Sequence, residues 1–335
     1  MPKKGIDVAT YIVTGVAGFI GSRVSELLLK AGHTVVGVDN MNDAYDVRLK
    51  QWRLAQVGEH PAFSFHGVDI TQRQPLNEIF TKLDQSHVNI AAIINLAAHA
   101  GVRQSVANPW VYMETNTTGT LNLLEQARLY SIPKFVLAST SSLYGNHNPM
   151  PYREDADTDH PLSPYAASKK AAELMCHTYH HLYGIDVTIF RYFTVYGPAG
   201  RPDMSLFRFV QWIDEGRPVL VYGDGSQSRD FTYIDDIASG TIAGLKPVGY
   251  AVVNLGSDQP VVLLDAIRLI EGMTGKAARL DFHPLPRTDV PATWADIHKA
   301  EQLLGWRPQV PIVTGIARLV DWYRANRAWA HAIRT

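Results

Sequence analysis

The fold is decided by the stretch Thr14–Gly21, TGVAGFIG, which follows a run of β-branched residues and opens a predicted helix over residues 22–30. Glycines at this spacing predict a tight turn at Gly15 and a close backbone approach at Gly18, before a helix N-terminus that can hold a phosphate. Asp39 ends the next β-branched run, where a carboxylate can bind a ribose hydroxyl. Together these features favour a dinucleotide-binding βαβ unit over an ordinary turn, and the charge of Asp39 favours NAD over NADP.

The alternation of strand and helix patterns continues over the first 190 residues, which predicts an α/β fold with a doubly wound parallel (Rossmann) sheet. After Tyr192, Pro and Gly interrupt the chain more often, so we expect a smaller C-terminal α/β substrate-binding domain. The predicted NAD-binding domain is 1–191 with 231–257 returning to it, and the second domain is 192–230 with 258–335. The predicted strands are 8–13, 34–38, 62–65, 91–96, 134–138 and 186–190.

Composition limits the class of protein. The 335 residues are 46% hydrophobic and 19% charged with a net charge of −1, which is typical of a globular chain without the basic footprint of a nucleic-acid binder. The single cysteine, Cys176, cannot form an intramolecular disulfide or a zinc site by itself, so we expect a buried filler and no metal in the site. The chain has no apolar run of 18 residues and no secretory signal, which predicts a soluble cytoplasmic protein without a membrane partner.

A second motif, Ser163–Lys169 (SPYAASK), predicts a helix that begins with a serine cap and a proline. Tyr165 and Lys169 then lie one turn apart on the same face, where the ammonium can favour the phenolate. A second copy of this spacing, Tyr130–Lys134, is disqualified because Pro133 prevents the helix. The competing interpretation of either motif alone is a surface tyrosine and lysine on a helix.

A third motif is Ser139–Gly145, STSSLYG, at the end of the fifth predicted strand. Four consecutive hydroxyl residues there lie where doubly wound sheets bind ligands, and they offer hydrogen bonds without charge. A plain serine-rich turn is the alternative.

In this order and spacing, the three motifs resemble the extended short-chain dehydrogenase/reductase family of nucleotide-sugar enzymes, over essentially the whole chain. Further segments that carry this resemblance are NLAAH at 95–99, NTTGT at 116–120 and RDFTYIDD at 229–236. Within the family, the chain is most similar to the enzymes that epimerise UDP-glucuronate at C4. That closer similarity lies in AGVR at 100–103, RYFTVYGP at 191–198, GRPDM at 200–204 and DVPAT at 289–293.

The resemblance implies that Tyr165 is the catalytic base, with Thr140 as its hydroxyl partner and Lys169 beside it. It implies that Arg229 binds the pyrophosphate of the sugar nucleotide, with Arg287 a weaker candidate because the family usually shows other residues there. The implied NAD contacts are Gly15, Gly18, Phe19, Ile20, Gly21, Asp39, Asn40, Asn42, Asp69, Ile70, Ala97 and Lys169. The implied sugar-nucleotide contacts are Arg103, Ser141, Ser142, Thr194, Arg201, Arg229 and Arg287.

Residues at the strand end select among the reactions of this family. Similar 4,6-dehydratases carry Asp-Glu where Ser141 and Ser142 stand, and UDP-glucuronate decarboxylases carry Glu at Ser142, so elimination and loss of CO₂ are disfavoured. UDP-glucose 4-epimerases carry Asn at Thr194, and they are the alternative. An NAD-sensing protein without catalysis should lack the Tyr/Lys pair. The resemblance also implies a homodimer formed through helices near 109–128 and 163–183.

Overall fold

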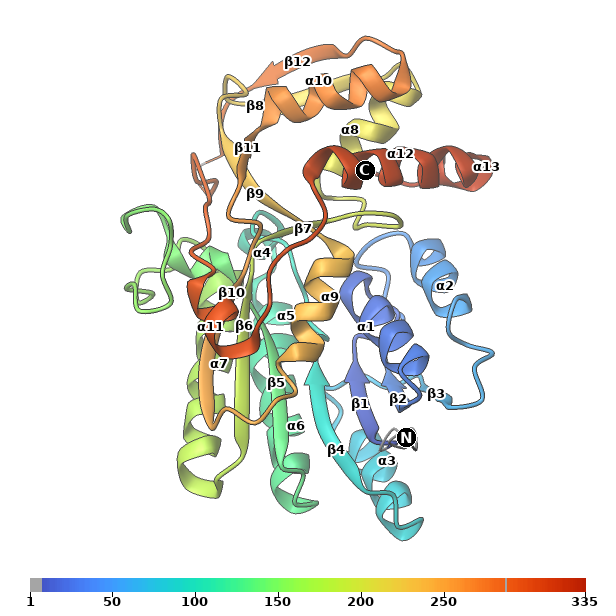
Figure 1. Ribbon diagram of the computed structural model, residues 1–335, viewed down its shortest axis with the longest axis vertical. Coiled ribbons are helices and arrows are strands. Elements are labelled where there is room, and N and C mark those ends of the chain that lie inside the picture. Colours follow the sequence, from blue (N-terminus) through green and yellow to red (C-terminus); the bar gives the residue numbers. More distant parts are fainter. Residues whose placement is uncertain (1–7, 287) are drawn as a thin grey trace, which may run out of the picture.

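Seven parallel strands form the central sheet of the computed structural model, which describes residues 8–286 and 288–335 (Figure 1). The strand order is β10-β6-β5-β4-β1-β2-β3, which confirms the predicted doubly wound fold. The strands are β1 (Thr10–Thr14), β2 (Thr34–Val38), β3 (Phe63–His66), β4 (Ile90–Asn95), β5 (Lys134–Thr140), β6 (Asp186–Tyr192) and β10 (Tyr250–Leu255).

All six predicted strands are present, with ends that differ by up to two residues from the expected ones. The strand β5 continues past its apolar run through Ser139 and Thr140, because the backbone there still pairs with β6 as far as Tyr192. This extension fixes the first hydroxyl residues rigidly at the carboxyl edge of the sheet.

Helices cover both faces of the sheet. One face packs against α1 (Phe19–Lys30) and α9 (Ile234–Ala243), and the other packs against α3 (Arg73–Gln85), α6 (Gly119–Leu129) and α7 (Pro164–Tyr183). The connections into these layers include α2 (Val47–Ala55), α4 (Gln104–Ala107), α5 (Pro109–Tyr112) and a π-helical turn at Met113–Thr118. Cys176 is fully buried in the second of these layers, as expected for a filler. None of the helices within the described ranges has the length and apolar character needed to cross a membrane.

The helix α7 begins and ends as its sequence predicts. The Ser163 hydroxyl accepts a hydrogen bond from the Ala166 N–H at 3.2 Å, and Gly184 ends the helix with a φ of 71°. The competing Tyr130–Lys134 copy is not helical, because α6 ends at Leu129 and β5 begins at Lys134.

The second part of the molecule lies above the carboxyl edge of the sheet in Figure 1. Its strands are β7 (Thr194–Tyr196), β9 (Ser228–Tyr233) and β11 (Pro260–Val262) in one sheet, and β8 (Pro218–Tyr222) with β12 (Arg279–His283) in another. Its helices are α8 (Ser205–Asp214), α10 (Leu263–Thr274), α12 (Ile312–Ala325) and α13 (Arg327–Ala330). By contrast α11 (His298–Leu304), which the predicted division assigns to this part, packs on β10 and α9.

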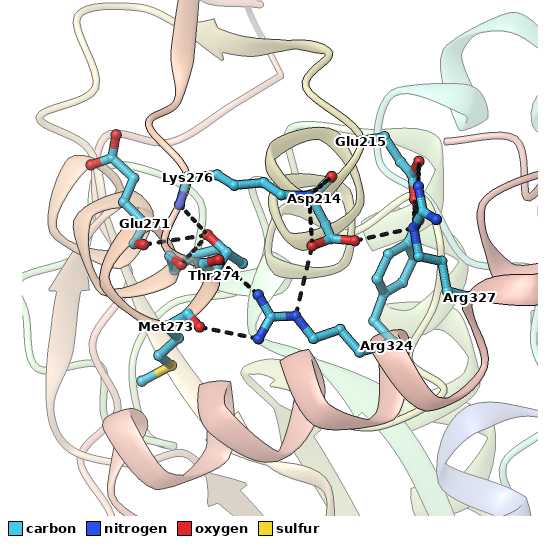
Figure 2. A network of polar contacts seen from close by, with 10 residues as sticks. Asp214, Glu215, Glu271, Met273, Thr274, Lys276, Arg324 and Arg327 are labelled. Carbon is cyan, nitrogen blue, oxygen red and sulfur yellow. Dashed lines mark hydrogen bonds and ion pairs between the residues drawn. The ribbon is translucent and has the colours of Figure 1, made fainter.

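A polar network joins the helices of this second part (Figure 2). Asp214 ends α8 with its carboxylate buried, and three cations surround it: the Nζ of Lys276 at 3.1 Å, the Nε of Arg324 at 3.7 Å and the Nε of Arg327 at 3.4 Å. A carboxylate at a helix C-terminus opposes the helix dipole, so these cations offset an unfavourable position. Arg324 also donates to the Thr274 carbonyl at 2.8 Å, which ties α12 to the end of α10.

Candidate active site

A cavity of about 870 Å³ lies between the two parts of the molecule, at the carboxyl ends of the central strands. Every site residue predicted from the sequence lines this cavity, with the exception of Arg287, which lies outside the described residues. The sheet supplies one wall, and residues of β7, α8 and β9 supply another. Motifs that are far apart in the sequence therefore meet in one place.

The glycine motif forms one end of this cavity. Gly15 has a φ of +68°, and a Cβ there would lie 2.7 Å from the backbone nitrogen of Ala97, so no other residue fits. Gly18 caps α1 without a side-chain hydrogen bond, which leaves the first N–H groups of the helix available to an anion. The Asp39 carboxylate accepts hydrogen bonds from the N–H groups of Ala17 at 3.1 Å and Met41 at 2.8 Å. A turn of this shape fits the pyrophosphate and ribose of a dinucleotide.

Polar side chains continue along the same end. The amide of Asn40 donates to Asp69 at 2.6 Å, and hydrogen bonds of this kind lower the pKa of the Asp69 carboxyl although its burial acts in the opposite direction. The ammonium of Lys50 donates to Asn42 at 2.9 Å and lies 3.8 Å from Asp39. Sequence reasoning missed Lys50, because a lysine on a helix such as α2 is expected to face solvent.

Tyr165 lies at the centre of the cavity wall. Burial raises the pKa of its phenol, while a hydrogen bond with the Thr140 hydroxyl and the positive charge of Arg201 lower it. The structure thus brings together the two residues expected to act as base and hydroxyl partner. It also adds a cation, Arg201, that acts on the same phenol.

Lys169 lies on α7 one helical turn from Tyr165, as the spacing predicts, and its ammonium is held by the neighbouring strand. Its Nζ donates to the Ala138 carbonyl at 2.8 Å, because a buried ammonium needs an acceptor and the end of β5 provides one. Burial lowers the pKa of Lys169 to about 8, and the Glu173 carboxylate opposes that shift. The ammonium therefore stands one helical turn from Tyr165, anchored to the strand.

Glu173 continues the same face of α7, one further turn along. It accepts a hydrogen bond from the Ser139 hydroxyl at 2.5 Å and a two-pronged pair from Arg191 at 3.1 and 2.9 Å. Three consecutive residues at the end of β5 thus contact three α7 residues spaced four apart. The sequence analysis did not single out Glu173, although its spacing from Lys169 is the signal that could have found it.

Hydroxyl and charged groups line the cavity around Tyr165. Ser141 and Ser142 open a 3₁₀ turn (Ser141–Tyr144), and the Ser142 N–H donates to the Thr140 hydroxyl at 3.1 Å. Thr194 begins β7 on the opposite wall. Arg201 is paired with Asp203, with 3.1 Å between Nε and Oδ1, a partner that sequence reasoning missed.

Arginines gather at the far end of the cavity. Arg103 forms a two-pronged pair with Asp289 at 3.1 and 2.6 Å and lies 4.1 Å above the Tyr222 ring. Arg229 donates to the Ser228 carbonyl at 2.8 Å, and burial lowers the pKa of its guanidinium. Arg208, missed from the sequence, reaches the same cavity from α8. These three guanidinium groups suit a diphosphate, whose charge and geometry arginine matches well.

Comparisons with known proteins agree with this geometry. The profile of the family described as GDP-mannose 4,6 dehydratase matches residues 12–319. The chain is 55% identical, over 94% of its length and 96% of the relative, to a UDP-glucuronate 4-epimerase of Thermodesulfobacterium geofontis (strain OPF15). Its fold matches the crystal structure of UDP-glucuronic acid 4-epimerase from Bacillus cereus in complex with UDP-glucuronic acid and NAD, with a TM-score of 0.88, 37% identity and coverage of 95% and 99%.

A UDP-glucose 4-epimerase from Thermotoga maritima, solved with UDP-glucose, is also similar, with a TM-score of 0.87, 30% identity and coverage of 95% and 99%. These matches span nearly the whole chain and include both walls of the cavity. The chain therefore belongs to the extended short-chain dehydrogenase/reductase family, in the group that the GDP-mannose 4,6 dehydratase profile describes.

Proposed function

We propose that this protein interconverts UDP-glucuronate and UDP-galacturonate by NAD-dependent epimerisation at C4. The observation that carries the proposal is that Tyr165 lines the same cavity as Thr140 and a row of neutral hydroxyl groups, at a strand end without the acid that dehydration requires. The 55% identity to a UDP-glucuronate 4-epimerase and the 37% identity to one solved with UDP-glucuronic acid and NAD support the same reaction.

We assign NAD to the end of the cavity formed by the glycine motif. The uncapped N-terminus of α1 would bind the pyrophosphate, and Asp39 would accept the ribose hydroxyls. NAD held there would supply the acceptor for the hydride of C4 and the donor that returns it to the opposite face of the sugar. The predicted contacts that line this end are Gly15, Gly18, Phe19, Ile20, Gly21, Asp39, Asn40, Asn42, Asp69, Ile70, Ala97 and Lys169.

In this proposal the Tyr165 phenolate takes the proton of the sugar 4-hydroxyl and later returns it. Because burial raises the pKa of the phenol, the phenolate needs nearby positive charge and a hydrogen-bond donor. Arg201 would supply the charge and the Thr140 hydroxyl, which donates to Ser142 at 3.1 Å in this structure, would turn to donate to the phenolate; Lys169 adds a second cation one turn away. The sugar must then turn over in the cavity so that both faces of C4 are presented.

The hydroxyls of Thr140, Ser141, Ser142 and Thr194 would hold the uronate carboxylate. The 4-keto form of the sugar is a β-keto acid. Such an acid loses CO₂ most readily when the bond to its carboxylate stands perpendicular to the plane of the ketone. Several donors would keep the carboxylate out of that alignment. Arg229, Arg208 and Arg103 would bind the diphosphate at the far end of the cavity.

A panel of UDP-sugars with product identification by NMR tests this proposal. We expect kcat/KM to be higher for the two uronates than for UDP-glucose and UDP-galactose, with no CO₂ released and no NAD added. An equal or better kcat/KM with UDP-glucose would instead identify a UDP-glucose 4-epimerase, the alternative that the Thermotoga maritima structure represents.

We also propose a homodimer and a cytoplasmic location. Trp110 and Met113 before α6, and Leu174 and Leu182 on α7, are exposed apolar side chains on neighbouring elements, as an interface between two copies requires. The single buried cysteine, Cys176, suits a reducing compartment. Sedimentation equilibrium of the wild type and of Trp110→Glu tests the dimer, with a monomeric wild type counting against it.

A further inference from the structure

Outside the active-site cavity, the loop between the 3₁₀ turn and α7 brings together three side chains of types that bind metal ions. His147, Asp157 and His160 each place one ligand atom within 4.8 Å of the other two. Within residues 8–286 and 288–335 this is the only group of three or more histidine, cysteine or acidic side chains with such spacing. The proposed epimerase reaction uses none of the three.

The distances suit a small divalent ion. The Nε2 of His147 lies 3.4 Å from the Oδ2 of Asp157, and the Nδ1 of His160 lies 2.9 Å from the same oxygen. Ligands bound tetrahedrally at about 2.0–2.1 Å from Zn²⁺ lie roughly 3.3–3.4 Å apart. Small side-chain rotations therefore convert the observed contacts into coordination distances.

Hydrogen bonds from one backbone N–H and from the Asn148 side chain order the loop that carries the ligands. The Asp159 N–H donates to the second oxygen of Asp157 at 2.8 Å, which orients the carboxylate. The amide of Asn148 donates to the carbonyls of Tyr144 and Asp157 at 2.6 Å each, which closes the loop around the cluster. Its amide nitrogen also lies 3.3 Å from His147 Nε2, so the same side chain contacts the first ligand of the cluster.

We propose that His147, Asp157 and His160 bind one divalent transition-metal ion of the Zn²⁺ class. Two imidazoles and a carboxylate match the donor preferences of these ions better than those of Mg²⁺ or Ca²⁺. The side chains are 39%, 44% and 74% exposed, so water completes the coordination. The same loop contributes Gly145, Tyr152 and Ser163 to the cavity wall, so the ion fastens a segment beside the substrate site.

Titration calorimetry of the untagged protein, with its resident dinucleotide, tests the site with ZnCl₂ and with CoCl₂. We expect one ion per chain and the visible absorption of low-coordinate Co²⁺. His160→Ala and His147→Gln should each weaken Zn²⁺ binding by more than about 10-fold. Loss of a residue that only hydrogen-bonds to a metal ligand already weakens metal binding by about this factor, so loss of a ligand should cost at least as much. Zn²⁺ should also slow proteolysis between residues 146 and 162 in the wild type, but not in His160→Ala.

The matched control is His298→Ala. His298 is an exposed histidine paired with Asp296 at 2.8 Å, and it belongs to no three-ligand group among the residues that the structure describes. This variant should bind Zn²⁺ as the wild type does. The proposal is overturned if the wild type binds no ion at one equivalent, if His160→Ala binds as tightly as the wild type, or if His298→Ala weakens binding equally. None of these outcomes depends on which sugar the enzyme converts.

Discussion

Buried carboxylates are neutralised in two different ways in the two parts of the molecule. Glu173, beside the proposed catalytic groups, faces Arg191 in a pair whose side chains are both only 5% exposed. Asp214, in the second part, is 6% exposed, but its partners Lys276, Arg324 and Arg327 are about half exposed (Figure 2). Water can therefore replace a lost partner in the second network and not in the first. The first holds reacting groups in place, and the second joins helices.

The largest effect is expected at Tyr165 itself. Tyr165→Phe removes the proposed base and should lower kcat by about 10²–10⁴-fold, while dinucleotide binding and folding persist. The matched control is Tyr112→Phe, because the Tyr112 ring lies 6.1 Å from that of Tyr165 and its hydroxyl has no hydrogen-bond partner among the described residues. Steady-state kinetics of both variants measure the effect. If Tyr165→Phe kept a near wild-type kcat, a group other than Tyr165 would be the base.

Glu173→Gln should separate positioning from catalysis. Loss of the carboxylate leaves Arg191 buried without its counter-charge, so we expect the free energy of unfolding to fall by about 3 kcal/mol. The Glu173 carboxylate also raises the pKa of Lys169, which lies at about 8. In the variant this pKa should fall, so Lys169 should lose its proton at a lower pH. The descending high-pH limb of kcat would then move to lower pH. A limb that stays in place while stability falls would leave Glu173 with a purely structural role.

The contrast also explains which features could be predicted from the sequence. The glycine turn, the strands and α7 follow from local signals: periodicity, a positive φ that requires glycine, and a capped helix start. Glu173, Lys50 and Arg208 were missed because a charged residue on a helix is expected to face water. Their inward orientation depends on strands and loops far away in the sequence. For the same reason the acceptor of Lys169, a carbonyl of β5, could not be predicted.

On the sugar side of the cavity, Thr194→Asn replaces a hydroxyl that we assign to the uronate carboxylate. The preference for UDP-glucuronate over UDP-glucose, measured as the ratio of kcat/KM values, should fall by roughly 1–3 kcal/mol, the cost of a mispaired buried polar contact. Thr194→Ser keeps the hydroxyl and should retain the preference. An unchanged ratio in Thr194→Asn would mean that Thr194 only packs against the sheet.

The smallest effect is expected in the second network. Asp214→Asn removes the negative charge that three cations share, but water reaches those cations, so the loss of the ion pairs costs little. The substitution also removes the unfavourable interaction of the carboxylate with the dipole of α8, which partly offsets that loss. We expect the free energy of unfolding to change by about 1 kcal/mol or less, with a dependence on salt, and kcat to stay unchanged. Asp265→Asn is the exposed control, because it removes the pair with Arg268 and a favourable charge in the first turn of α10. Denaturant unfolding at low and high salt measures both variants. If Asp214→Asn destabilised the protein as much as Glu173→Gln, solvent exposure of the partners would not be what distinguishes the two networks.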